Sequence, residues 1–278
     1  MSWNIVLDSS CDLTPQHEFK NVNIKIAPLT IRVGDKEFVD DENIDVPALL
    51  DAMEKEKTAS STACPSPNDF YENFLTADNI ICICITSNLS GTYNAAVQAA
   101  EMVKEEYPEK NIHVINSWST AGEMVLIARK ADQLIGEGLP FEEVVAKLEE
   151  YTQEVRLVFT LEKFDNLIKA GRMKPLVGKV VSALGIHLIA QASVDGRVEL
   201  MFKVRGDEKT LEKMVEYMNE QKDMTGKPVV INHCNNHKMV ERLKELIKEK
   251  CKTEDITVLH CKGLTTFYAM EKGILIGY

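Results

Sequence analysis

The sequence predicts an α/β fold with two domains, and three observations support this prediction. Strand-like apolar segments alternate with helical segments through the first half, as in parallel βαβ units with helices on both faces of a sheet. After about residue 154 the rhythm changes, and a turn signal at Val194–Arg197 joins two strand-like segments into a hairpin. The length of 278 residues is also long for one domain. We therefore expect a parallel three-layer domain over residues 1–154 and a two-layer domain with a mixed sheet over residues 155–278.

The first half contains strand-like segments that are apolar or alternate with period two, at residues 4–10, 22–34, 79–85 and 111–117. Helices are expected where apolar residues recur at helical spacing, as in "NIDVPALLDAMEKEK", at residues 43–57, 91–106, 121–137 and 139–155, with a short helical turn at 12–19. Each helix therefore follows or precedes a strand, as crossover connections require.

The second half predicts strands at residues 155–160, 186–193, 197–205, 228–234, 256–261 and 273–278. Helices are expected at residues 161–170, 176–185, 208–221 and 238–251. The segment "LVGKVVSALGIHLI" (176–189) is dense in Val and Leu and too short to span a membrane, so it is equally compatible with a core helix and with the wall of an apolar tunnel.

Composition excludes several classes of function. The net charge of −11 disfavours binding to nucleic acids and to anionic membrane surfaces, which attract basic patches. No run approaches 18 apolar residues, so we expect no integral membrane segment. The chain enters its first strand without a secretory signal, and its seven cysteines form no disulfide framework. We expect a cytoplasmic protein with free cysteines, in which Cys82 and Cys84 pack as small apolar residues.

Hydroxyl-rich stretches follow three elements of the first half. They are "LDSSCDL" (7–13), "SSTACPSPNDF" (60–70) and "ITSNLSGTYNAA" (85–96). Ligands of open α/β sheets bind at the carboxyl ends of strands, and a helix N-terminus there offers free amides to an anion. Ser90 and Gly91 stand just before such a helix, and Gly91 would let an anion approach the backbone. The alternatives are that Ser90 is only an N-cap and that residues 60–70 are only a turn.

Other candidate sites are weaker. His233 and His237 flank "CNN" and could belong to a metal site, but no acidic residue joins them, so we expect no metal. The segment "GRMKPLVGK" (171–179) lacks the spacing and the Ser or Thr of a phosphate loop. Cys64 has no neighbouring base in the sequence that would make it a nucleophile.

The hydroxyl stretches, in this order, resemble the DegV family of bacterial fatty-acid-binding proteins. "DSSCD" (8–12) matches the family's "DS(S/T)xD", "TACPS" (62–66) its "TSQPS" loop, and "TSNLSGTYNAA" (86–96) its "SSxLSGTYxxA". "INSWSTAG" (115–122), "LIKAGRMK" (167–174) and "KVRGDEK" (203–209) extend the resemblance over essentially the whole chain.

The resemblance implies a long-chain fatty acid buried between two α/β domains, with no cofactor. Its carboxylate would be held by Thr62 and Ser90, with Gly91 beside them. Ser9, Ser61, Arg172 and Cys261 form a second tier of expected site residues. Cys261 stands where the family's "GTHTGPG" segment has a histidine, because this chain reads "LHCKGLT" at 259–265. Since His260 is one position away in a strand, we expect it to point to the opposite face.

The family resemblance also implies a function without catalysis. The protein would carry the fatty acid and present its carboxylate to a separate fatty acid kinase that forms an acyl phosphate. The alternative is a small-molecule hydrolase or phosphotransferase that uses Ser90 as a nucleophile. "SNLSGT" lacks the "GxSxG" elbow, and no His–acid pair is evident. Chain length and saturation of the fatty acid, the identity of the kinase, the effect of the divergent segment and the oligomeric state stay open.

Overall fold

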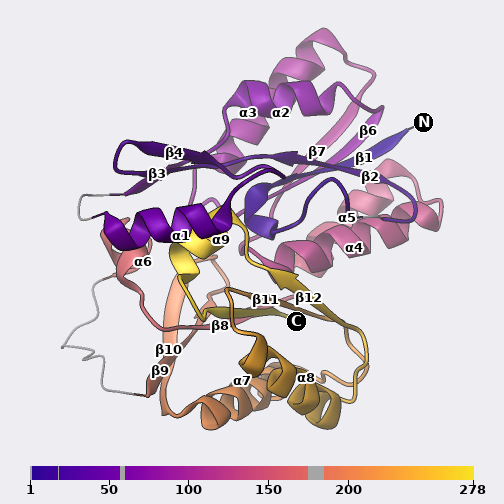
Figure 1. Ribbon diagram of the computed structural model, residues 1–278. Coiled ribbons are helices and arrows are strands. Elements are labelled where there is room, and N and C mark those ends of the chain that lie inside the picture. The colour runs from indigo at the N-terminus through magenta and orange to yellow at the C-terminus, as the bar shows by residue number, and fades with distance from the viewer. Residues whose placement is uncertain (1, 18, 57–59, 175–184) are drawn as a thin grey trace.

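The structure, a computed structural model, describes residues 2–17, 19–56, 60–174 and 185–278. The predicted α/β class is confirmed (Figure 1). Strands up to Asn116 and strands from Leu157 onward belong to different sheets. The division into two domains at residues 154 and 155 stays a prediction.

The first sheet is parallel throughout. Its strands lie in the order β2 (Asn23–Ala27), β1 (Trp3–Asp8), β6 (Asn79–Cys84) and β7 (Asn111–Asn116). One face is covered by α2 (Pro67–Phe74) and α3 (Thr92–Glu106), the other by α4 (Gly122–Gly136) and α5 (Phe141–Thr152) (Figure 1). These elements form the three layers that the sequence predicts.

β6 shows why its sequence is apolar at every position. Ile81 and Ile83 pack into the core that contains α4 and α5, whereas Cys82 and Cys84 pack on the opposite face against α2 and α3. A strand covered on both faces buries both sets of alternating side chains, so it needs no polar face. The expectation that the two cysteines pack as small apolar residues is therefore confirmed.

The second sheet has six strands and is mixed. Their order is β10 (Val198–Arg205), β9 (Ile186–Ala192), β8 (Leu157–Leu161), β13 (Ile274–Gly277), β11 (Val229–His233) and β12 (Ile256–His260). β11 and β12 are parallel, and the other neighbouring pairs are antiparallel. The helices α7 (Asp207–Gln221) and α8 (His237–Cys251) pack on one face (Figure 1). The short helix α6 (Asp165–Lys169) follows β8.

A third, antiparallel sheet of three short strands corrects the sequence analysis. Residues 22–34 were predicted as one strand region, but Pro28 separates β2 from β3 (Thr30–Val33), since proline cannot donate a ladder hydrogen bond. β3 pairs with β4 (Lys36–Val39) and with β5 (Ser61–Ala63), which was predicted as a loop. Two helices pack against it, α1 (Val46–Lys55) and the unforeseen α9 (Gly263–Ala269).

The end of β1 also differs from the prediction. A short 3₁₀ turn η1 (Ser9–Cys11) follows directly and ends at Asp12, whose φ is 61°. Of the helical turn expected at 12–19, the described residues show a single hydrogen-bonded turn from Thr14 to His17. The η1 turn directs the Asp12 carboxylate toward the second sheet. The carboxylate accepts hydrogen bonds from Asn232 Nδ2 and from the Lys262 backbone N–H, both at 2.8 Å. These hydrogen bonds link the end of β1 to Asn232 and to Lys262, which are far from it in the chain.

The two large sheets meet most closely at α4. A Cβ on Gly277 of β13 would lie 2.4 Å from the backbone carbon of Gly122, so only glycine allows the helix to approach the strand there. Within the described parts of the chain, no helix is both long enough and apolar enough to cross a bilayer.

Candidate ligand site

A cavity of about 310 Å³ lies between the first and second sheets. Its wall is mainly apolar, with Leu29, Ile85, Leu89, Leu157, Phe159, Leu161, Leu167, Ala192, Val198, Leu264, Ala269 and Leu275. Polar residues line it as well, namely Thr62, Cys64, Thr86, Ser90, Ser119, Thr120, Arg172, Arg197, Thr265 and Tyr268. The expectation that side chains from both halves line one cavity is confirmed. An apolar pocket with a few convergent polar groups is typical of a small-molecule site.

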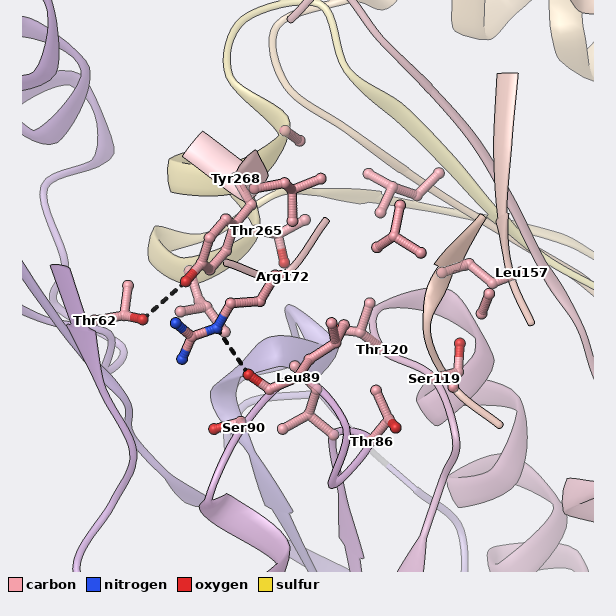
Figure 2. A pocket seen from close by; sticks show the side chains of 18 of the residues that line it. Thr62, Thr86, Leu89, Ser90, Ser119, Thr120, Leu157, Arg172, Thr265 and Tyr268 are labelled. Carbon is pink, nitrogen blue, oxygen red and sulfur yellow. Dashed lines mark hydrogen bonds between the residues drawn. The ribbon is translucent and has the colours of Figure 1, made fainter. Parts of the chain in front are cut away.

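Thr62 reaches the cavity because it lies on β5. Successive side chains of a strand point to opposite faces, so Thr62 lines the cavity while the preceding residue, Ser61, is exposed and does not line it. The Thr62 hydroxyl lies 3.0 Å from the Tyr268 hydroxyl on α9 (Figure 2). Since either hydroxyl can donate in this pair, one proton remains available for a ligand.

Ser90 and Gly91 form the entry to α3. The Ser90 hydroxyl lies 2.8 Å from that of Thr92 and accepts only a long bond, 3.4 Å, from the Thr92 N–H. Gly91 is the N-cap residue of α3. Since glycine has no side chain, the N-cap position supplies no side-chain hydrogen bond to the first amides of the helix. The first amides of a helix carry partial positive charge. This end of the cavity therefore suits an anion.

Arg172 brings a formal positive charge to the same end. Its Nε donates to the Leu89 carbonyl at 3.0 Å and its Nη1 to the Ala170 carbonyl at 2.6 Å, which hold the guanidinium next to Ser90 (Figure 2). None of the ion pairs found among the described residues involves Arg172. The charge is therefore available to a carboxylate or another anionic head group.

Figure 2 shows Thr62, Tyr268, Arg172 and Ser90 at the same end of the cavity. Gly91 and Cys64 are exposed there, whereas Leu157, Phe159 and Leu275 are buried. The polar end is thus accessible from solvent. A bound molecule with a polar head and an apolar tail would place its head at this end.

Three buried carboxyl groups support the loops around the cavity. Asp40 accepts the N–H groups of Gly263 and Leu264 and so caps α9, and Asp8 accepts the Ile85 N–H at 2.6 Å. Burial raises the pKa of Asp8 to about 6 and that of Asp12 to about 7. Burial raises the pKa of Asp40 as well. These groups fix backbone segments and do not line the cavity.

The structure separates the expected site residues into two groups. Thr62, Ser90, Gly91 and Arg172 line the one cavity. The remaining three lie elsewhere, each for a local reason. Ser9 is buried and its hydroxyl accepts the Leu29 N–H at 3.0 Å. Ser61 lies on the outer face of β5. Cys261 packs in the apolar cluster with Cys234, and burial raises the pKa of its thiol.

Tyr268 and Thr265 line the cavity but were not predicted. Both belong to α9, and Thr265 also hydrogen-bonds with Asp12. The segment "GLTTFYA" is short and lacks a clear helical period, so the divergent motif was the only signal of it in the sequence. Of the expected tunnel wall at 176–189, residues 176–184 lie outside the described residues. Leu188 and Ile189 are core residues of β9.

A family model described as "Uncharacterised protein, DegV family" matches residues 2–276. The chain belongs to the DegV family. A DegV domain-containing protein of Streptococcus gordonii is 39% identical over 279 residues, which cover 100% of this chain and 99% of that protein. The resemblance stated from the hydroxyl motifs is therefore confirmed.

Solved DegV structures share the whole fold. The Streptococcus pneumoniae Fatty Acid Kinase (Fak) B3 protein, loaded with linoleic acid, is 39% identical with a TM-score of 0.95 and covers 100% of this chain and 99% of its own. A DegV family protein from Eubacterium eligens, loaded with heptadecanoic acid, is 35% identical with a TM-score of 0.94 and covers 99% of both chains. DegV proteins of known structure thus hold fatty acids.

Proposed function

We propose that this protein binds a long-chain fatty acid in the cavity between the two large sheets. The acyl chain lies against the apolar wall, and the carboxylate lies among Thr62, Ser90, the Gly91 amide and Arg172. The observation that carries the proposal is the single cavity with an apolar interior and these hydroxyl and cationic groups at its accessible end. Relatives whose structures hold linoleic or heptadecanoic acid support it.

The energetics favour a long acyl chain. Burial of a methylene contributes about 0.8 kcal/mol, so about fifteen methylenes contribute roughly 12 kcal/mol before the ordering of chain and protein is subtracted. The carboxylate adds specificity because two hydroxyls, a helix N-terminus and a guanidinium can each stabilise its charge. A molecule that lacked either part would lose one of these two contributions.

The cavity gives no support to a hydrolase or phosphotransferase that uses Ser90. None of the described residues that line it is a His, an Asp or a Glu, so no general base lies beside the Ser90 hydroxyl there. The Ser90 hydroxyl lies 2.8 Å from the hydroxyl of Thr92. A carrier role needs no such base.

We further propose that the protein presents the carboxylate to a fatty acid kinase for acyl-phosphate formation. Two observations support this role. The polar end of the cavity is bordered by the exposed residues Gly91 and Cys64, so a second protein could reach the head group. The 39% identical pneumococcal relative is a Fatty Acid Kinase B3 protein.

Titrations with matched ligands test the binding proposal. Delipidated protein should bind a sixteen- or eighteen-carbon fatty acid and bind the methyl ester or alcohol of the same length at least about tenfold more weakly, since a charge-assisted hydrogen bond contributes about 1.5–3 kcal/mol. Equal affinity for acid and ester would contradict the carboxylate assignment.

The kinase role is tested by adding a bacterial fatty acid kinase and ATP to the loaded protein. Acyl phosphate should form, and a loaded protein that yields none would contradict that role.

A further inference from the structure

Three histidines form a cluster outside the acyl cavity. His233, His237 and His260 each offer a ring nitrogen, and these nitrogens all lie within 4.8 Å of one another. The ring centroids are 4.5 Å apart for His233 and His260, 5.0 Å for His233 and His237, and 5.3 Å for His237 and His260. Half of the six histidines of the chain are therefore gathered in one place.

The fold brings the three rings together by two independent routes. His233 ends β11 and His260 ends β12, and the two residues are partners in the parallel register of these strands. Partners in neighbouring strands lie close together with their side chains on the same face. His237 is the first residue of α8, and a tight turn in which Asn235 has a φ of 50° connects β11 to this helix. The turn places the His237 ring beside that of His233. From the sequence alone we expected no metal at His233 and His237, and the strand register changes this picture by adding His260.

The surroundings leave the cluster accessible. His237 and His260 are exposed, whereas His233 is 2% exposed and lies at the base. None of these three rings has a carboxylate partner among the described ion pairs, unlike His113 and His187, which pair with Glu149 and Asp207. A cavity of about 590 Å³ adjoins His233 and His260 and is also lined by Glu42, Glu271 and Lys262. Additional ligands, including water, have room to approach.

We propose that His233, His237 and His260 bind a divalent transition-metal ion of the zinc type. Imidazole nitrogen suits Zn²⁺, Ni²⁺ and Cu²⁺, whereas Mg²⁺ and Ca²⁺ prefer oxygen ligands. Three histidines with one position left open are a known donor set for zinc. This inference rests on the cluster alone and does not depend on fatty-acid binding.

His237 and His260 are the anchoring ligands of this site. The Nδ1 of His233 accepts the Asn236 N–H at 3.2 Å, so metal binding at either ring nitrogen costs this hydrogen bond. A metal on Nδ1 takes the accepting lone pair, and a metal on Nε2 requires the proton to move to Nδ1. The positive end of α8 also opposes a cation slightly. Zinc–nitrogen bonds of about 2.0–2.1 Å require the rings to close around the ion. The two exposed histidines can turn to do so, and His233 completes the site.

The position of the cluster links it to the acyl site without making it part of that site. His260 is followed by Cys261 and Lys262 and then by α9, which carries Thr265 and Tyr268 of the acyl cavity. Metal binding at the end of β12 would therefore stabilise the segment from which α9 starts. A ligand that binds only the folded state raises the stability of that state.

The test is a calorimetric titration of untagged, chelator-treated protein with Zn²⁺, alongside His237→Ala, His260→Ala and the matched control His113→Ala. Wild type and His113→Ala should bind one Zn²⁺ per chain and should show no binding of Mg²⁺. Each cluster variant should bind at least about tenfold more weakly, since even the loss of an outer-shell partner costs about 10–100-fold. Zinc held by the exposed Cys64 would persist in the cluster variants and is thereby distinguished.

Visible absorption of bound Co²⁺ and thermal melting of the variants complement the titration. Co²⁺ should give the visible absorption of a low-coordinate, nitrogen-ligated ion in wild type and lose it in His237→Ala. His237 is exposed, and thermal melting of the metal-free variants verifies that they are folded; His237→Asn replaces His237→Ala if the latter is not. The proposal is overturned if wild type binds no Zn²⁺, or if folded cluster variants bind it as well as His113→Ala does.

Discussion

Ser61 and Thr62 are neighbours on β5, yet only the Thr62 hydroxyl lines the cavity. This difference allows a controlled test of the head-group assignment. Thr62→Val and Ser90→Ala should each weaken fatty-acid binding by about 1.5–3 kcal/mol, because each removes a hydrogen bond to a charged group. Ser61→Ala should leave the affinity unchanged. Fluorescence displacement with a labelled fatty acid measures all three, and a loss in Ser61→Ala equal to that in Thr62→Val would reject the assignment.

Arg172 is a second residue-scale test, because it supplies charge as well as hydrogen bonds. Arg172→Gln should weaken binding of a fatty acid by more than it weakens binding of the matching alcohol, since only the acid is anionic. Arg32 is exposed and pairs with Glu37, so Arg32→Gln is the matched control for the change in net charge. Isothermal titration with acid and alcohol gives the difference. Equal losses for the two ligands would mean that Arg172 only shapes the wall.

At the residue scale, the resemblance to the DegV family implied that Thr62, Ser90 and Arg172 lie near the carboxylate, with Gly91 beside them, and all four line one cavity. Whether they hold one anion is still a prediction. Tyr268 could not be predicted, because its role depends on a hydroxyl pair with Thr62 across 206 positions of the chain. Ser61 and Cys261 show the converse. Alternation along β5 points the Ser61 side chain away from the cavity, and the Cys261 side chain packs in an apolar cluster.

At the scale of elements, the contact of α4 with β13 is the most restrictive. A Cβ on Gly277 would come within 2.5 Å of the Glu123 backbone nitrogen, and backbone cannot move as a flexible side chain does. Gly277→Ala should therefore lower the free energy of unfolding by about 1–3 kcal/mol, the range for overpacking. Gly91→Ala is the control, since its φ is −73° and its Cβ would lie 3.5 Å from Cys64 Sγ. Urea unfolding of both variants checks the contrast, and equal stability of the two would contradict it.

The long elements could be predicted from the sequence because their periodicity is strong. The expected helix at 91–106 is α3, the expected helix at 121–137 is α4, and the fully apolar run at 79–85 contains β6. The short elements could not. β3, β5 and α9 have three to seven residues, too few for a period to show, and they are held by contacts with one another and with Asp40. These short elements carry Thr62, Thr265 and Tyr268, so the part of the fold that completes the site was the part least visible in the sequence.

At the scale of the whole molecule, buried carboxyl groups set an unusual dependence of stability on pH. Burial raises the pKa of Asp8 to about 6 and the pKa values of Asp12 and Glu123 to about 7, from the ordinary values of 3.8 for Asp and 4.5 for Glu. Between about pH 4 and pH 7 the folded state therefore binds more protons than the unfolded state. The free energy of unfolding should rise as the pH falls through this window, by at most about 1.4 kcal/mol per pH unit for each group.

Asp12→Asn isolates one of these groups. Asn tolerates the positive φ at position 12, and its amide can donate to Asn232 Oδ1, which is buried and has no hydrogen-bond partner among the described residues. The variant should fold and show a shallower pH dependence. The lowered pKa of a carboxyl such as Asp78 matters only below about pH 4. Burial lowers the pKa of His233 from 6.5 to about 4, which opposes the effect between these pH values but involves fewer groups than the raised carboxyls do. Urea unfolding at several pH values between 5 and 8 measures it, and a wild-type stability that falls steadily toward pH 5 would refute the account.

The molecule as a whole is proposed to enclose one fatty acid between its two large sheets, and its ligand content tests this most directly. The mass of the intact protein, purified from bacteria under mild conditions, should be measured by native mass spectrometry. Its lipids should then be extracted and analysed. The account predicts one long-chain fatty acid per protein chain, lost on denaturation and regained when fatty acid is added to the delipidated protein. Protein that carries no fatty acid and takes up none when it is added would contradict the account.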